Sequence, residues 1–238
     1  MYYNNKDVVV MKRIIFLALV SLFLTACDSG LEEQKKDEYI AGGMSYYTHY
    51  IQTYVDATSI KPVIDSNDGV ILVAEGTGHF GADLCYKYND VGFNRTMADF
   101  ITSCVLNHFT KINLVSNKDF DEAHKAGTSL GDIAYFVGGS AKPFIDGKYD
   151  KSLNYNWKES PEVYKKIGGV GLWYHYGFSP LYLKLQDITE DSLLLASDTF
   201  GISFASLPTL EKEHTFTLTA TDCNGKTLQV VFDWEFVS

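Results

Sequence analysis

The 238-residue chain has few basic residues, few prolines and few cysteines. It has 20 Lys and Arg residues and 30 Asp and Glu residues, which gives a formal net charge of −10 at pH 7. A chain this acidic is repelled by nucleic acid and by anionic lipid surfaces, so we set aside both classes of partner. The four cysteines are too few for a disulfide-dense scaffold. The long apolar runs are also too short for a bilayer span, which takes about 20 helical residues.

The apolar run Ile14–Ala26 has the layout of an export signal. Met11-Lys12-Arg13 places two cations before it, and Leu24-Thr25-Ala26 places small residues just before Cys27. A basic start, an apolar centre and a small-residue cleavage site are typical of a secretory signal that is removed. Residues 1–10 hold an acidic residue and no basic cluster, so we expect translation to begin at Met11.

Leu24-Thr25-Ala26-Cys27 resembles the lipobox of bacterial lipoproteins. The resemblance implies cleavage before Cys27 and a diacylglycerol attached to its sulfur, whereas the alternative is a buried or disulfide-bonded Cys27. Residues 27–38 are rich in charge and contain almost no apolar residues, which predicts a flexible tether. The acidic stretch also resembles the export tag of Bacteroides-type surface lipoproteins. We therefore expect an outer-membrane lipoprotein, held either on the cell surface or on the periplasmic face.

Three cysteines remain after lipidation, and an odd number leaves at least one thiol unpaired within the chain. We expect a disulfide between Cys85 and Cys104, since closing a loop of that size contributes about 3 kcal/mol. Three buried free thiols are the alternative, because spacing does not fix connectivity. Cys223 is the unpaired residue in the first case.

The segment 39–238 is rich in Tyr, Phe, Thr and Val, which favours strands, and it shows apolar and polar alternation. The alternation is clearest at Ile112–Val115, Leu181–Leu185, Thr215–Thr219 and Gln229–Phe236. Asn224-Gly225 predicts a tight hairpin between the last two, and short helices are expected at Asp119–Lys125 and from Ser160. We therefore expect a single mainly β domain, an antiparallel β-sandwich that is immunoglobulin-like at its C-terminal end.

Three stretches resemble a family of uncharacterised Bacteroides-type lipoproteins. They are Ile112–Asp121, Ala126–Leu130 and Glu213–Leu218. The resemblance implies an envelope location and a β-rich fold, and it implies no particular chemistry.

Two glycine-containing motifs match catalytic or cofactor patterns without the context that those patterns need. Gly76–Gly81 fits G-x-G-x-x-G, but we expect no long helix after it and interpret it as a glycine-rich loop after a strand, without a nucleotide cofactor. Gly127–Gly131 fits G-x-S-x-G around Ser129, but a charged segment stands where the supporting strand should be. His124 or His175 would have to partner Ser129 in a hydrolase.

The sequence predicts no metal site. Asp65–Gly69 and Asp119–Glu122 offer oxygen ligands for calcium, yet neither matches a 12-residue EF-hand loop, and the first is ordinary turn chemistry. The six histidines lack the spacing of zinc sites.

Aromatic residues are concentrated between Tyr155 and Phe178. The members are Tyr155, Trp157, Tyr164, Trp173, Tyr174, Tyr176 and Phe178. Exposed aromatic faces beside amides and charges suit a glycan or a protein, so we take Tyr155, Trp157, Tyr174 and Tyr176 as candidate ligand-binding residues. The alternative is that alternate aromatics, Trp173 and Phe178 above all, fill the core.

These features together favour a non-enzymatic binding or structural module of the cell envelope, anchored to the membrane through lipid and contacting a glycan or a protein. An extracytoplasmic hydrolase is the alternative, with carboxylates or Ser129 assembled only by the fold. A deep cleft with convergent carboxylates would favour the enzyme, and a flat exposed aromatic surface would favour the binder.

Overall fold

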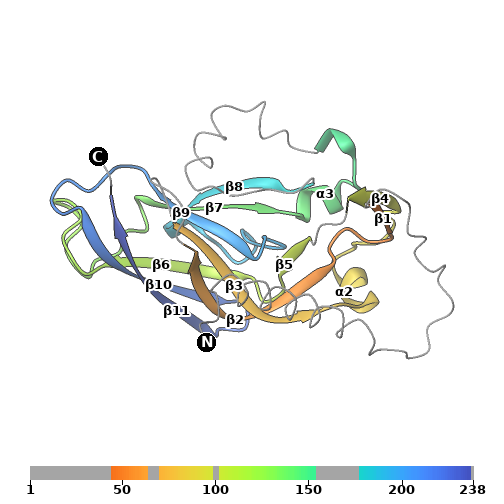
Figure 1. Cartoon of the computed structure of the whole chain (residues 1–238), viewed down its shortest axis with the longest axis horizontal. Coiled ribbons are helices and arrows are strands. Elements are labelled where there is room, and N and C mark those ends of the chain that lie inside the picture. The colour runs from red at the N-terminus through yellow and green to blue at the C-terminus, as the bar shows by residue number, and fades with distance from the viewer. Residues whose placement is uncertain (1–43, 64–69, 99–101, 154–176, 237–238) are drawn as a thin grey trace, which may run out of the picture. The chain divides into compact units, whose positions relative to one another are not determined.

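The computed structural model describes residues 44–63, 70–98, 102–153 and 177–236, all of which belong to the compact unit Tyr39–Ser238. This unit is mainly β (Figure 1). Its strands are β1 (Met44–Tyr47), β2 (Thr53–Val63), β3 (Val70–His79), β4 (Arg95–Ala98), β5 (Ser103–Val105), β6 (Phe109–Ser116), β7 (Ala134–Ser140), β8 (Ser179–Lys184), β9 (Thr199–Phe204), β10 (Glu213–Asp222) and β11 (Thr227–Glu235). The helical segments are short: α2 (Ala82–Lys87), α3 (Lys142–Asp146), η2 (Lys151–Leu153) and η4 (Leu185–Asp187).

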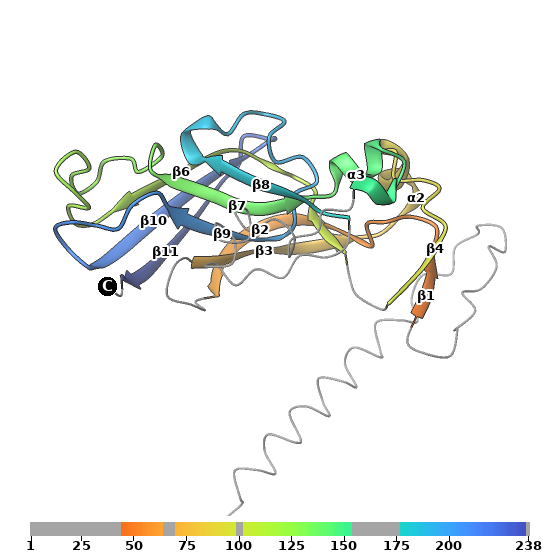
Figure 2. The same cartoon turned by 90° about the horizontal axis from the view of Figure 1, so that it is seen from above.

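The strands form three sheets, which the view in Figure 2 shows from a second side. The largest has the order β5-β2-β3-β9-β7-β8, the second has the order β11-β10-β6, and β1 pairs with β4. Neighbouring strands are antiparallel except for β2 and β5, which are parallel. The expected antiparallel arrangement is therefore correct apart from one short pair.

The two larger sheets share one apolar core. Along β10 and β11, every second residue is buried, so that Phe216 and Leu218 face inward beside Phe232. The same cluster includes Leu72 of β3 and other residues of the six-stranded sheet. Two sheets that bury their alternating inner faces against each other make a β-sandwich, as predicted. The immunoglobulin-like detail stays a prediction.

A second core lies beneath α2 and α3, around the fully buried carboxylate of Asp90. That carboxylate accepts hydrogen bonds from the backbone N–H groups of Tyr50 (2.8 Å) and Ile51 (2.7 Å) and from the hydroxyl of Tyr149 (2.9 Å). These donors offset the cost of removing a carboxylate from water. Phe178 belongs to the same core and is 1% exposed, so the core interpretation holds for this aromatic residue.

Gly76 and Gly78 lie inside β3, so the expected glycine-rich loop is wrong. The strand continues to His79 and pairs with β2 through Ala57 and Val55. The register shifts between Ala57 and Ser59, which is the mark of a β-bulge. A Cβ atom on Gly76 would stand 1.9 Å from the carbonyl oxygen of Asp56, so the close approach of the two strands requires glycine there.

The short helix expected at Asp119–Lys125 is also wrong, because aspartate side chains take the backbone donors that a helix would use. Asp121 Oδ1 accepts hydrogen bonds from the N–H groups of Ala123 and His124, each 2.8 Å long. Asp119 Oδ1 accepts one from Ala126 at 2.9 Å. Aspartate competes with helical hydrogen bonding in this way, and the segment folds as a bent loop.

The C-terminal hairpin is confirmed, with one correction to its turn. β10 and β11 pair from Glu213↔Glu235 to Thr221↔Thr227. Gly225 has φ +79°, whereas Asn224 is not among the residues with positive φ. The turn is instead organised by Asp222, whose Oδ1 accepts hydrogen bonds from the N–H groups of Asn224 and Lys226, both 2.9 Å long.

The expected disulfide is not formed: Cys85 and Cys104 are both buried free thiols, and Cys223 is an exposed one. Cys104 is the direct register partner of Tyr54 across β2 and β5, and Cys85 hydrogen-bonds to the side chain of Tyr54. Tyr54 thus neighbours both cysteines, Cys85 through its side chain and Cys104 through strand pairing. Among the described residues, no helix is long and apolar enough to span a bilayer.

Candidate functional site

A polar groove lies at the end of the three-stranded sheet where β10 begins and β11 ends. Its volume is about 470 Å³. It is lined by Asn117, Lys118, Glu213, His214, Thr215, Asp233, Trp234 and Glu235. We call this feature the acidic groove, because three of its lining residues are carboxylates and one is a lysine.

The hairpin register brings the carboxylates together. Glu213 stands directly opposite Glu235, and Thr215 stands opposite Asp233. All four belong to the alternate positions of β10 and β11 that do not face the core. Like charges directly opposite on neighbouring strands destabilise a sheet. Repulsion between Glu213 and Glu235 therefore destabilises this end of the hairpin, and a bound cation would reduce that repulsion.

Three hydrogen bonds fix the polar wall of the groove. The hydroxyl of Thr215 donates to Asp233 Oδ1 at 2.7 Å, which orients that carboxylate. The N–H of Thr215 donates to Asn117 Oδ1 at 2.8 Å, and Asn117 N–H donates back to the carbonyl of Thr215 at 3.0 Å. Asn117 thus extends the pairing of β6 and β10 into the groove. Lys118 Nζ lies 3.8 Å from Oε2 of Glu211, a residue that does not line the groove.

The buried histidine of the groove has both ring nitrogens occupied. Its Nε2 lies 2.8 Å from the carbonyl oxygen of Glu211, which can only accept, so Nε2 carries a proton. Its Nδ1 lies 2.7 Å from Ser116 Oγ. His214 is 3% exposed and packs against Phe120 and Phe216. Because Nε2 is protonated, the lone pair of Nδ1 accepts the hydrogen bond from the Ser116 hydroxyl, and the two contacts hold the end of β10 in place.

Trp234 is the aromatic residue of the groove lining, and it is 5% exposed. Its ring packs edge to face against Phe236 with centroids 6.0 Å apart. Within the described part of the chain, its Nε1 has no hydrogen-bond partner. A buried indole N–H without an acceptor costs free energy.

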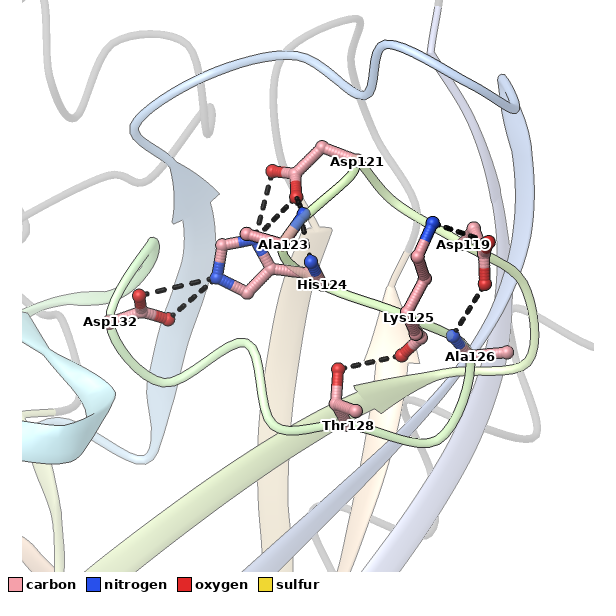
Figure 3. Close-up of polar contacts among 8 residues, drawn as sticks. All are labelled: Asp119, Asp121, Ala123, His124, Lys125, Ala126, Thr128 and Asp132. Carbon is pink, nitrogen blue, oxygen red and sulfur yellow. Dashed lines mark hydrogen bonds and ion pairs between the residues drawn. The ribbon is translucent and has the colours of Figure 1, made fainter.

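His124, which the sequence offered as a partner for Ser129, is held between two aspartates (Figure 3). Its Nδ1 lies 2.8 Å from Asp121 Oδ1, and its Nε2 lies 3.1 Å from Asp132 Oδ1. Burial alone would lower the pKa of His124, but the hydrogen bonds to Asp121 and Asp132 outweigh it and raise that pKa. Each ring nitrogen therefore faces a carboxylate, and the two contacts close the loop between β6 and β7.

The carboxylates of this loop act on the loop itself. The pKa of Asp121 is lowered, since hydrogen bonds from the backbone and ring of His124 outweigh the opposing effect of burial. The pKa of Asp119 is lowered by the backbone hydrogen bond from Ala126 and by Lys125, whose Nζ lies 3.1 Å away. Figure 3 shows these side chains directed at other residues of the same loop.

The described residues contain no group of three or more ligating side chains that could hold a metal.

Ser129 lies outside any catalytic arrangement that the described residues show. Its hydroxyl donates to Asn113 Oδ1 at 2.6 Å, and its oxygen accepts the N–H of Gly131 at 3.2 Å. It forms an isolated bridge with Val115 of β6 instead of a turn between a strand and a helix. The structure therefore does not bring Ser129 and His124 together as a nucleophile and its base.

Several residues chosen from the sequence fall outside the described residues. These are Cys27, Tyr155, Trp157, Tyr174, Tyr176, His175 and the whole of Asp65–Gly69. The acidic groove, in turn, was missed. A signal for it was present, because alternation along Thr215–Thr219 and Gln229–Phe236 and the turn at Asn224-Gly225 together fix the register that places Glu213 opposite Glu235.

Comparison with known proteins supplies no relative: no family model matches the chain, and no curated protein or solved structure matches it. The function must therefore be argued from the chain itself.

Proposed function

We propose that the chain is a lipid-anchored, non-enzymatic binding module of the bacterial cell envelope, attached to the outer membrane through Cys27. Its ligand surface is the acidic groove, and its ligand is a protein segment that presents a Lys or Arg side chain. The supporting observation is the direct opposition of Glu213 and Glu235 beside Asp233 in a groove of about 470 Å³.

The charge of the groove favours a cationic ligand over a neutral glycan. An ammonium or guanidinium group would lie among three carboxylates and offset the repulsion between Glu213 and Glu235. The hydrogen bond from Thr215 already holds Asp233 in position, so less side-chain freedom is lost on binding. The lipid anchor would confine this groove to the membrane surface.

The first test measures binding of a hexalysine peptide by calorimetry at low salt, with hexaglutamate as the negative peptide. We expect Glu213→Gln combined with Glu235→Gln to weaken binding about fivefold, since each exposed ion pair contributes about 0.2–1 kcal/mol. The matched control, Asp187→Asn combined with Glu190→Gln, removes the same charge away from the groove and should change affinity little.

The outcome separates a site from a general charge effect. Equal weakening by the groove pair and the control pair would show that hexalysine is attracted only by net charge, and the proposed ligand class would be wrong. Flotation of wild-type and Cys27→Ser chains with membranes tests the anchor independently.

A further inference from the structure

Four of the exposed apolar side chains belong to segments at one end of the domain. Phe80 follows β3 and is 75% exposed, and Tyr86 of α2 is 71% exposed. Tyr46 of β1 and Val91, which follows α2, are 40% and 41% exposed. Figures 1 and 2 both place α2, β1 and β4 at the right-hand end. We call these four side chains the apolar tip.

The backbone of the apolar tip is fixed to the second core. Asp90, next to Val91, accepts the hydrogen bonds from Tyr50 and Ile51 described above. The N–H of Phe93 donates to the carbonyl of Thr48 at 3.0 Å, which joins the chain after α2 to the chain after β1. The fold therefore holds the chain on both sides of Val91 and joins it to the chain that follows Tyr46.

The described part of the chain begins at this same end, with β1. β1 begins at Met44, and residues 28–43 separate it from Cys27. An extended chain spans at most about 3.5 Å per residue, so the anchor keeps β1 within about 60 Å of the lipid. A tether that joins the domain beside the apolar tip brings the tip to the membrane more readily than the opposite end.

We propose that the apolar tip contacts the boundary between headgroups and acyl chains of the membrane that holds Cys27. This inference rests on the lipid anchor of the proposed function. Phenylalanine and tyrosine suit that boundary, where one end of a ring is apolar and the other is wet. Asp83 and Lys87 of α2 carry opposite charges, so the contact needs no anionic lipid. With the tip on the membrane, the domain is held in one orientation.

The test uses the full-length chain, purified with its lipid and reconstituted into phosphatidylcholine vesicles that contain brominated acyl chains. Phe80→Trp and Tyr86→Trp place a fluorophore in the tip. Leu207→Trp is the matched control, because Leu207 is also exposed, at 57%, in the loop between β9 and β10 at the opposite end (Figure 1). The emission of the three native tryptophans is subtracted with a wild-type sample measured in parallel.

We expect bromine to quench the tip tryptophans at least about twofold more than Trp at position 207, as for interfacial side chains. Equal quenching at positions 80 and 207, or none at 80 and 86, in a chain that floats with vesicles would overturn the membrane contact alone. A chain with Cys27 intact that does not float would overturn the anchor, and the membrane contact with it. If the tip tryptophans were not quenched and the chain self-associated, the apolar tip would be a contact with a second copy of the chain instead.

Discussion

The side-chain amide of Asn107 donates a hydrogen bond of 2.8 Å to the carboxylate of Asp222, and this contact joins the two sheets of the sandwich. The same amide donates to the carbonyl of Ala57 at 3.0 Å, and its oxygen accepts the N–H of Ala57 at 2.6 Å. Asn107 therefore pairs with β2 at the bulge as a strand would, while Asp222 closes the hairpin turn. One buried side chain thus couples the bulge to the hairpin.

Removing this amide should be costly. Asn107 is 4% exposed, so Asn107→Ala leaves the backbone groups of Ala57 and the Asp222 carboxylate without their partner. We expect a loss of about 3 kcal/mol in the free energy of unfolding, measured by urea denaturation. Asn107→Asp should cost at least as much, because it sets a second carboxylate against Asp222. Asn113→Ala, on the outward side of β6, is the control and should cost less than about 1 kcal/mol. Equal losses at positions 107 and 113 would contradict the coupling.

The two glycines of β3 should respond differently to a methyl group. In Gly76→Ala the new Cβ meets the carbonyl oxygen of Asp56 at 1.9 Å, and backbone cannot move aside cheaply. We expect a loss of about 2–3 kcal/mol in the free energy of unfolding, as for overpacked sites. In Gly78→Ala the nearest atom is Cγ2 of Thr53 at 3.1 Å, which can rotate away. A thermal melt in which Gly78→Ala lost as much as Gly76→Ala would show that the bulge does not set the requirement.

The sequence predicts what depends on local alternation and misses what depends on partners far along the chain. The alternation of β10 and β11 predicts the strands, the hairpin and the sandwich, because the buried face of a strand repeats every second residue. The role of Gly76 follows from the Asp56 carbonyl, which lies on another strand, and no local pattern encodes that approach. Opposite the bulge in β2, the chain at Gly76–His79 therefore continues as a strand, where the sequence predicted a loop.

Ambiguous local chemistry explains the helix that was wrongly expected at Asp119–Lys125. Aspartates at the start of Asp119–Lys125 fit a helix N-terminus, but they equally fit a loop in which each carboxylate accepts nearby N–H groups. Asp132, which binds His124 from beyond that segment, favours the loop. The acidic groove was within reach of the sequence, because its carboxylates follow from the hairpin register alone, whereas its volume needs the structure.

The three thiols should differ in reactivity. Burial raises the pKa of all three thiols, but Cys223 is exposed to solvent, whereas Cys85 and Cys104 are buried. In a Cys27→Ser chain at neutral pH, we expect iodoacetamide to modify only Cys223 in the folded protein, and all three thiols after unfolding in urea. Mass spectrometry of peptides locates the modification. If Cys85 and Cys104 stayed unmodified in urea until a reductant was added, the two would be disulfide-bonded after all.

The contact of His124 with Asp121 and Asp132 should stabilise the loop between β6 and β7 only within a window of pH. The pKa of His124 is raised on folding, so its contribution is fully present below its unfolded value, about 6.5, and is lost as pH rises through the folded pKa. The pKa of Asp121 is lowered, so its contribution is present above its unfolded value, about 3.9, and is lost as pH falls through the folded pKa. The full stabilisation lies between about pH 4 and 6.5.

We therefore expect His124→Gln to lower the urea midpoint more at pH 5.5 than at pH 8.5. Glutamine keeps the polar character of the site but carries no charge at either pH, so the pH-dependent part of the loss reports the imidazolium. Lys125→Gln, which removes the neighbouring ion pair to Asp119, is the control and should show a loss that changes little between the two pH values. A loss at His124→Gln that was equal at both pH values would mean that the neutral imidazole holds the loop as well as the charged one. The two aspartates would then act as plain acceptors, and the raised pKa of His124 would have no consequence for folding.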